Sequence, residues 1–167
     1  HPYFNVSPYE YAQDLGDCAT PNTDLTSMRA SLAEQIPAML AQYHMCWLGG
    51  DHSITLALLR AYRAWAGKPL AVLHFDAHCD TWTDHFGESS GHGTWVYEAI
   101  QEGLVDVESF VQVGIRSSGV REAREYVQDQ GGFIVTARDM RGLASEAQLS
   151  EVLINIRERL SAKGLPV

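Results

Sequence analysis

The chain alternates short, continuously apolar runs with longer stretches in which apolar residues recur every three or four positions. Runs of the first kind are typical of strands that a sheet buries on both faces, whereas stretches of the second kind are typical of amphipathic helices. We therefore predict strands at residues 44–48, 69–75, 109–116 and 131–137.

Helices are predicted between these strands, at residues 23–44, 53–65, 94–104 and 119–130, with a last helix that ends before Gly164. Pro37 is expected to interrupt the first helix, Ser53 to cap the second, and Ser145 with Gln148 to form a capping box. Residues 1–22 are predicted to form an extended surface segment. Because strands alternate with helices, we predict one α/β domain with a mainly parallel sheet.

Composition narrows the class of protein. The 167 residues, 46% of them hydrophobic, are enough to bury the core of one domain. Twelve basic against 21 acidic residues give a net charge of −9, which argues against nucleic acid as a partner. No apolar run is long enough to cross a membrane, and the three cysteines lack C-x-x-C spacing. We predict a soluble, cytoplasmic protein that binds neither nucleic acid nor membrane.

Acids and histidines follow two of the predicted strands. His52 lies in "GGDHS" after the strand at residues 44–48, and Asp76, His78 and Asp80 form "DAHCD" after the next strand. Ligands bind beyond the carboxyl ends of parallel strands, so both groups are expected at one edge of the sheet. In an extended backbone Asp76, His78 and Asp80 would leave by one face and Cys79 by the other.

Two imidazoles and two carboxylates form a mixed nitrogen and oxygen site that suits manganese, iron or zinc better than calcium. The alternative is a buried Asp–His hydrogen-bond network without metal, which the cost of burying unpaired carboxylates argues against. His74 is expected on the opposite side of the strand from these ligands, as a packing residue or as a contact of a ligand.

Four motifs, "GGDHS", "HFDAHCD", "GHGT" and "QVGIRS", occur in this order along the chain. With these gaps they resemble the ureohydrolases, the arginase and agmatinase family, and look closest to bacterial agmatinases. The resemblance implies a three-layer α/β sandwich in which a hydroxide held between two manganese ions hydrolyses a guanidinium group to urea and an amine. It also implies that His52, Asp76, His78 and Asp80 are metal ligands, with Asp76 bridging the ions.

His92 lies between two glycines on the loop at residues 81–93, where a histidine is usually only a surface residue. The resemblance instead gives His92 the role of catalytic proton shuttle to the leaving amine. Substrate selection is expected on the same loop, whose candidate contacts are Trp82, Asp84, Phe86 and Glu88, although no single substrate-binding residue is assigned. The expected substrate is a small cationic guanidino compound: agmatine is favoured, and arginine, guanidinobutyrate and guanidinopropionate stay open.

One departure from the family pattern affects the activity of this chain. The family takes two more aspartate ligands from a Ser-x-Asp-x-Asp strand end, which would follow Val167, and has a strand that would precede His1. We therefore expect residues 1–167 to be one partial ureohydrolase domain that is inactive in isolation, and we expect the complete enzyme to be a homo-oligomer.

Three alternatives compete with this interpretation. A nucleotide-binding module would use "GGDHS" to cradle a phosphate, but the chain lacks G-x-G-x-x-G and G-K-[ST], and the neighbouring acids would repel phosphate. A deacetylase-like hydrolase would bind one zinc ion instead of two manganese ions. A non-catalytic ligand-binding fragment is the third alternative.

Overall fold

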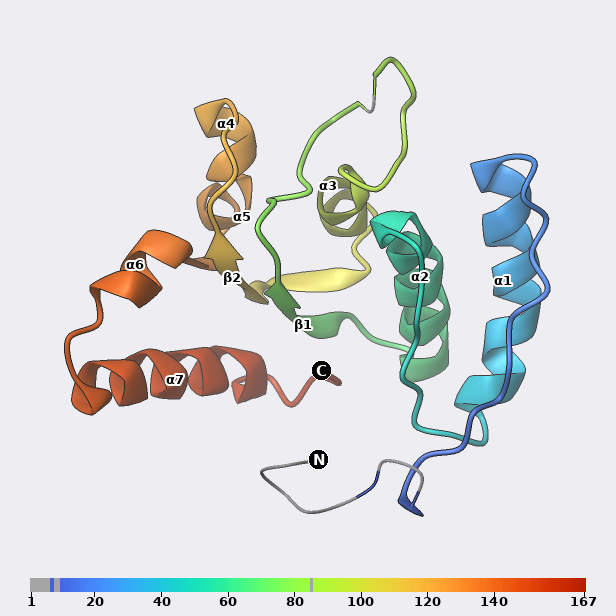
Figure 1. Cartoon of the computed structure of the whole chain (residues 1–167), viewed down its shortest axis with the longest axis horizontal. Helices are drawn as coiled ribbons and strands as arrows, with labels where there is room; N and C mark the ends of the chain where they lie inside the picture. The colour runs from blue at the N-terminus through green and yellow to red at the C-terminus, as the bar shows by residue number, and fades with distance from the viewer. Residues whose placement is uncertain (1–6, 8–9, 85) are drawn as a thin grey trace.

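The computed structural model describes residue 7, residues 10–84 and residues 86–167. The elements follow one another as shown in Figure 1. They are α1 (Leu25–Leu40), the short 3-10 helix η2 (His52–Ile54), α2 (Thr55–Ala66), β1 (Leu70–Phe75), α3 (Trp95–Gln101), β2 (Val105–Ile115), α4 (Arg121–Arg124), α5 (Tyr126–Asp129), β3 (Phe133–Thr136), α6 (Ala137–Gly142) and α7 (Glu146–Ser161).

Three parallel strands in the order β1, β2, β3 form the sheet. Alternate strand residues point to opposite faces. Leu70 and Phe110 therefore pack against α2 and α3 on one face, whereas Ala71 and Val111 pack against α7 on the other. Figure 1 shows α7 on one side of the sheet and α2 with α3 on the other. The predicted three-layer α/β sandwich is confirmed.

Helix α1 packs outside these layers, against α2. Asp24 caps α1 by accepting a hydrogen bond from the backbone N–H of Ser27. The predicted interruption at Pro37 is wrong, because α1 continues through Pro37 to Leu40. A proline lacks one backbone donor, but Ile36 and Leu40 on either side of it are buried against α2, which stabilises the last turn.

The predicted strand at residues 44–48 does not form. Its apolar side chains Met45 and Trp47 instead pack against the α1–α2 cluster, and the Trp47 indole donates a hydrogen bond to the Tyr62 hydroxyl at 3.1 Å. No strand of the described chain pairs with this segment, whose burial comes from the helices instead.

Other helix bounds also differ from the prediction. Asp51, not Ser53, caps the turn before α2, because its carboxylate accepts the Ser53 N–H. The helix expected at residues 119–130 is divided at Glu125 into α4 and α5. Helix α6 was not predicted, and it starts at a capping box formed by Thr136 and Asp139. Within the described residues, no helix is both long and apolar enough to cross a bilayer.

At its carboxyl end, β2 holds the turn that follows β1. The carbonyl of Val113 accepts a hydrogen bond from the Asp76 N–H at 3.1 Å, and the carbonyl of Ala77 accepts from the N–H of Arg116 at 2.9 Å. Gly114 lies between these contacts with φ +97°, where the strand register shifts. A Cβ at Gly114 would lie 3.1 Å from the Asp76 carbonyl oxygen, so only glycine fits there without displacing the turn.

We predict that Gly114→Ala lowers the free energy of unfolding by about 2–5 kcal/mol, because it combines a left-handed backbone with a backbone contact that is too close. Gly103→Ala is the matched control, since Gly103 has φ +64° but nothing within 4 Å of an added Cβ. It should cost about 1–2 kcal/mol. Urea unfolding of both variants measures the difference, and equal costs would contradict the role of the close contact.

Candidate metal centre

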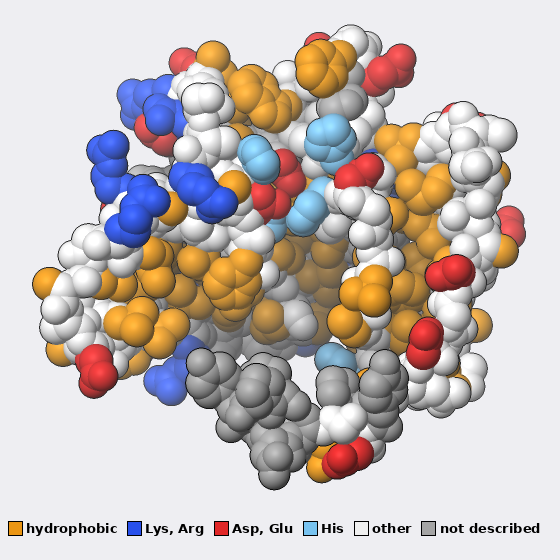
Figure 2. Space-filling model, in the orientation of Figure 1, with side chains coloured by type: hydrophobic (Ala, Val, Ile, Leu, Met, Phe, Trp, Pro, Cys, Tyr) orange, Lys and Arg blue, Asp and Glu red, His pale blue; other side chains and the backbone are white. Residues whose placement is uncertain are grey.

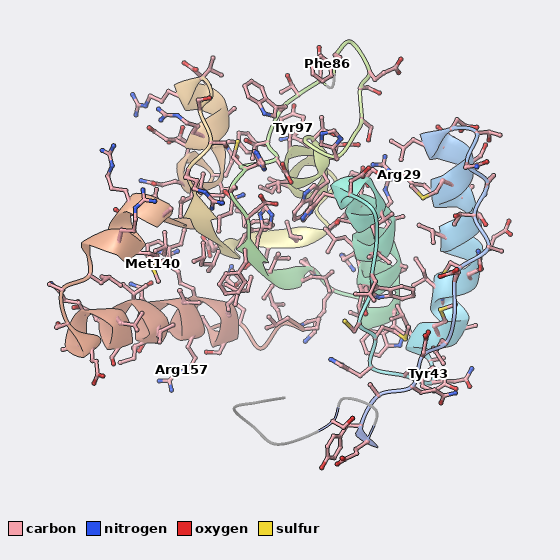
Figure 3. All side chains as sticks on the ribbon, viewed as in Figure 1. Arg29, Tyr43, Phe86, Tyr97, Met140 and Arg157 are labelled. Carbon is pink, nitrogen blue, oxygen red and sulfur yellow. The ribbon has the colours of Figure 1, made fainter. Side chains whose placement is uncertain are left out.

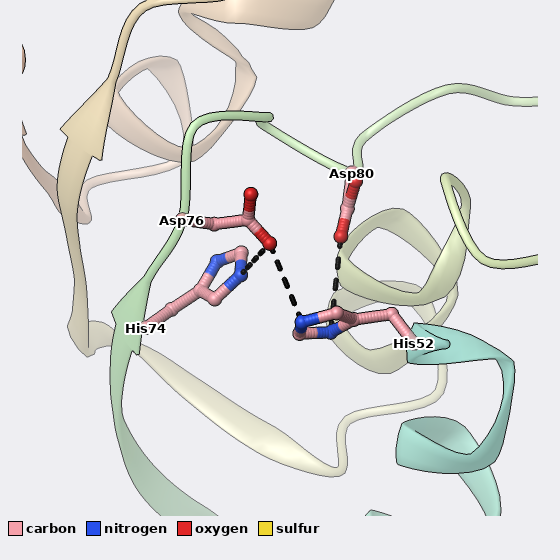
Figure 4. A group of neighbouring side chains, drawn as sticks. All are labelled: His52, His74, Asp76 and Asp80. Carbon is pink, nitrogen blue, oxygen red and sulfur yellow. Dashed lines mark hydrogen bonds and ion pairs between the residues drawn. The ribbon is translucent and has the colours of Figure 1, made fainter. Parts of the chain in front are cut away.

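Four side chains meet at the carboxyl edge of the sheet, beyond β1 (Figure 4). They are His52 from η2, His74 from β1, and Asp76 and Asp80 from the turn after β1. One possible ligand atom from each lies within 4.8 Å of those of the other three. In Figure 2, red and pale-blue side chains gather at the centre of this face. The structure thus brings His52, Asp76 and Asp80 together, with His74 and not the predicted His78 as the fourth member of the cluster.

Asp76 lies at the centre of the cluster, because both of its carboxylate oxygens face histidines. Its Oδ2 lies 3.3 Å from His52 Nε2 and 3.4 Å from His74 Nε2. Its Oδ1 accepts a hydrogen bond from the backbone N–H of His78 at 2.8 Å and lies 3.2 Å from His78 Nδ1. This carboxylate thus contacts three imidazoles from two separate segments of the chain.

Asp80 is held from the side of α3. The Trp95 indole N–H donates to Asp80 Oδ2 at 2.8 Å, and the Val96 N–H donates to the Asp80 carbonyl at 3.0 Å. His52 stacks on the Trp95 ring at 5.5 Å between ring centroids, and its Nδ1 lies 3.9 Å from Asp80 Oδ2. Trp95 therefore fixes the positions of both Asp80 and His52.

The expected extended course of residues 76–80 is wrong. Strand β1 ends at Phe75, and Asp80 has the left-handed φ of +53°. The Asp76 carboxylate closes the turn by accepting the His78 N–H, a local bond that competes with extended structure. As a result the His78 side chain is 69% exposed and, among the described residues, forms hydrogen bonds or ion pairs with Asp76 alone, whereas the Asp80 side chain is 8% exposed.

His74 lies on the same side of β1 as Asp76, so the expectation that it faces away from this site is wrong. Residues two apart in a strand share a face. His74 is buried, and its Nδ1 lies 3.1 Å from the amide nitrogen of Gln112 on β2. Burial lowers the pKa of His74 to about 4, so the ring is neutral at neutral pH.

The two carboxylates differ in their electrostatics. Burial alone would raise the pKa of Asp76. The hydrogen bond from the His78 N–H and the nearby imidazoles of His74 and His52 outweigh this effect, so the pKa of Asp76 lies below its usual range. Burial, together with the charge of Asp76, raises the pKa of Asp80 despite the Trp95 N–H. Within the described residues, neither acid forms an ion pair with a lysine or arginine. A divalent cation would supply the missing positive charge, and the mixed donor set fits one.

The loop with His92 is fixed to the same edge by a chain of polar contacts. Arg29 of α1 donates to the Ser53 carbonyl at 3.1 Å and to Ser90 Oγ at 2.6 Å. Ser90 in turn donates to Glu98 of α3, and the Gly91 N–H donates to Thr94 Oγ1, both at 2.8 Å. Arg29 thus joins the backbone next to His52 to the loop two residues before His92.

His92 is exposed and lies near the turn before α2. Hydrogen bonds from Ser53 are the main reason that the pKa of Asp51 is lowered, and the electrostatic effect of the nearby His92 and His52 lowers it further. His92 is therefore close to the His52 segment, although it does not belong to the cluster of four side chains.

The loop residues proposed for substrate selection, Trp82, Asp84, Phe86 and Glu88, are all exposed. Figure 3 shows Phe86 at the far end of the loop, with 97% of its surface exposed. The Trp82 N–H donates to the Gly93 carbonyl at 3.1 Å, and the Asp84 carboxylate accepts the Gly87 N–H at 3.0 Å. These contacts shape the loop. Which side chain meets a substrate stays a prediction.

Sequence reasoning missed three residues that hold the site: Arg29, Trp95 and Gln112. Gln112 gave a signal that could have been used, because it is a polar residue inside the apolar run "FVQVGI". Such a residue in a strand buried on both faces must have a polar partner. Cys79, which was expected to face away from the ligands, is buried with Ile115 and Ala123 as a small core residue.

A helix–sheet–helix sandwich with a His and Asp cluster at the carboxyl edge of parallel strands defines an α/β protein with a candidate metal centre. The Arginase family profile matches residues 5–165. The chain therefore belongs to the arginase family.

Individual relatives agree with this assignment. The chain is 47% identical over 105 residues to an agmatinase from Chromobacterium violaceum, covering 62% of this chain and 33% of the relative. It is 33% identical over 141 residues to a guanidinobutyrase from Pseudomonas aeruginosa, covering 83% and 44%. The solved proclavaminate amidino hydrolase from Streptomyces clavuligerus superposes with a TM-score of 0.74 at 33% identity, covering 89% of this chain and 47% of that one. The chain thus spans less than half the length of each.

We predict that Arg29→Lys speeds amide hydrogen exchange at residues 89–92 by about tenfold, because a lysine cannot hold the Ser53 carbonyl and Ser90 together. Arg159→Lys is the matched control. Arg159 lies on α7, on the other face of the sheet, where its guanidinium lies beside the Gly131 carbonyl and over the Phe133 ring. Exchange measured by mass spectrometry decides the point, and unchanged exchange in Arg29→Lys would show that the loop is held by other contacts.

Proposed function

We propose that this chain forms part of a ureohydrolase that hydrolyses a small cationic guanidino compound to urea and an amine. Agmatine is the favoured substrate, and manganese is the favoured metal. The observation that carries the proposal is the Asp76 carboxylate, which faces His52, His74 and His78 at the carboxyl edge of the sheet in a member of the arginase family.

Hydrolysis of a guanidinium group requires a stronger nucleophile than neutral water, because the carbon is stabilised by resonance. When bound, divalent ions would lower the pKa of water from 15.7 to about 7 and so supply hydroxide at neutral pH. His52, Asp76, His78 and Asp80 would hold these ions. Asp76 suits a shared ligand because its two oxygens face different histidines. Trp95 would keep Asp80 in place through its indole N–H.

His92 would transfer a proton to the leaving nitrogen, since an imidazole can both accept and donate a proton near neutral pH. Its exposed position near the His52 turn supports this role, because solvent can then reprotonate it. The polar chain from Arg29 through Ser90 to Glu98 would hold the loop in place while His92 acts.

The choice of agmatine rests on the higher identity to an agmatinase than to a guanidinobutyrase. A net charge of −9 supports a cationic substrate. The low share of the agmatinase covered supports one partial ureohydrolase domain in residues 1–167. A homo-oligomer stays a prediction from the family resemblance, and a cytoplasmic location stays a prediction from the composition.

We predict that Asp76→Asn removes most of the bound manganese, because an amide cannot supply the negative charge that the cluster shares. Metal content after dialysis, measured on the longest expressed form that contains residues 1–167, tests this. Asp106→Asn is the matched control, since Asp106 pairs with Lys163 outside the site. A normal manganese content in Asp76→Asn would refute the assignment of this ligand.

Urea release over a panel of guanidino compounds, with manganese present, tests the activity and identifies the substrate. We expect agmatine to be the best substrate, and we expect His92→Asn to lower turnover by about 10²–10⁴-fold with normal metal content. Loss of metal in His92→Asn would make His92 a ligand or a structural residue instead. Absence of urea from every compound would reject the proposed function.

A further inference from the structure

Gln112 occupies a position in the sheet where an apolar residue would be expected. It lies on the central strand β2, directly opposite His74 on β1, and its side chain is fully buried. Its amide nitrogen lies 2.8 Å from the Cys79 carbonyl oxygen and 3.1 Å from His74 Nδ1. The Gln112 side chain therefore contacts His74, whose ring faces Asp76, and the backbone of Cys79, which directly precedes Asp80.

The Cys79 carbonyl decides the orientation of this amide. A carbonyl oxygen can only accept, so the Gln112 atom that faces it must be the NH2 group. The second hydrogen of that group is then directed to His74 Nδ1, which must accept it and therefore carries no proton. In a neutral imidazole the proton must then lie on Nε2, and the Nε2–H of His74 faces Asp76 Oδ2 at 3.4 Å.

We propose that Gln112 is a positioning residue of the metal centre: it fixes His74 as a hydrogen-bond donor to Asp76 and, by holding the Cys79 carbonyl, sets where Asp80 lies. This rests on the proposed function, in which Asp76 and Asp80 bind metal. His74 is then not a metal ligand, although it lies among the four clustered side chains, because the nitrogen that faces the site carries a proton.

A further observation supports a specific role for the amide. Gln112 Oε1 is buried and has no hydrogen-bond partner within the described residues. A buried acceptor without a partner destabilises the fold, so a valine or isoleucine would serve the strand better. What the amide adds are its two N–H groups: one is directed to the Cys79 carbonyl next to Asp80, and the other to His74, whose ring faces Asp76.

The first experiment measures the protonation of His74 directly. The protein is labelled with ¹⁵N in histidine, prepared without metal, and its ring nitrogens are followed by NMR at neutral pH, with His74→Gln used to assign the signals. We expect His74 to have a protonated Nε2 and a bare Nδ1. In Gln112→Met, which keeps the length of the side chain but lacks both donors, we expect the two tautomers to mix. A proton on Nδ1 of His74 in the unsubstituted protein would overturn the proposal, whether or not the variant folds.

The second experiment titrates the same proteins with Mn²⁺ alone. We expect Gln112→Met to weaken binding by about 10–100-fold, as is usual when a contact of a ligand is lost. Ser109→Ala is the matched control. Ser109 is a buried polar residue of the same strand, but its hydroxyl donates a hydrogen bond to Asp106, outside the metal centre. Unchanged Mn²⁺ affinity in a folded Gln112→Met protein would overturn the proposal.

A pair of His74 variants separates positioning from ligation. The amide nitrogen of a glutamine reaches about as far as imidazole Nε2, so His74→Gln keeps an N–H toward Asp76, whereas His74→Leu does not. We expect His74→Gln to keep most of the Mn²⁺ affinity and His74→Leu to lose it. Equal loss in both would make His74 a ligand and would reject the proposal.

These measurements do not depend on urea release. If no guanidino compound is hydrolysed but the NMR and Mn²⁺ results are as expected, the proposed function fails and the role of Gln112 stands. If urea is released and Gln112→Met changes neither the tautomer nor the affinity, the role of Gln112 fails and the function stands.

Discussion

The structure of the site depends on how one carboxylate, Asp76, is kept largely out of water. Its oxygens face histidines on two sides, and no lysine or arginine of the described chain pairs with it. Since burying an ionised carboxylate is costly, its partners must be groups that can donate hydrogen bonds or a cation that can bind it. His74 is buried and neutral and offers only one N–H. The negative charge shared by Asp76 and Asp80 is thus only partly balanced by the chain itself, which favours a cation.

The sheet creates this environment through backbone contacts as much as through side chains. The turn after β1 is bonded to the end of β2 at Asp76 and Ala77, and to α3 at Asp80. Two segments that are distant in the sequence therefore converge on residues 76–80. Because each bond holds a main-chain atom, the positions of the carboxylates follow from the packing of the layers.

Periodicity was enough to predict β1, β2, β3 and the layers around them, because burial on both faces leaves continuous apolar runs. It failed at residues 44–48, where an apolar run packs on helices without a strand beside it. The convergence of His52 with Asp76 and Asp80 was expected because both motifs follow predicted strands, although only the strand before Asp76 forms. The shape of the turn could not be predicted, since it depends on the Asp76 carboxylate accepting the His78 N–H.

The contrast between His74 and His78 shows why residue type alone does not assign a role. Both rings contact Asp76 and both are two residues from it, one before and one after. His74 belongs to the strand, so the sheet buries it and Gln112 occupies its Nδ1. His78 lies in the turn, so its ring is mostly exposed, and no side chain on another strand of the described chain forms a hydrogen bond with it. A ring nitrogen of His78 can therefore direct its lone pair to a cation, whereas the ring nitrogen of His74 nearest Asp76 already carries a hydrogen. His74 is a hydrogen-bond donor to Asp76 because it lies on the strand, on the same face as Asp76 and beside Gln112. His78 is a candidate ligand because the turn leaves its ring exposed next to Asp76.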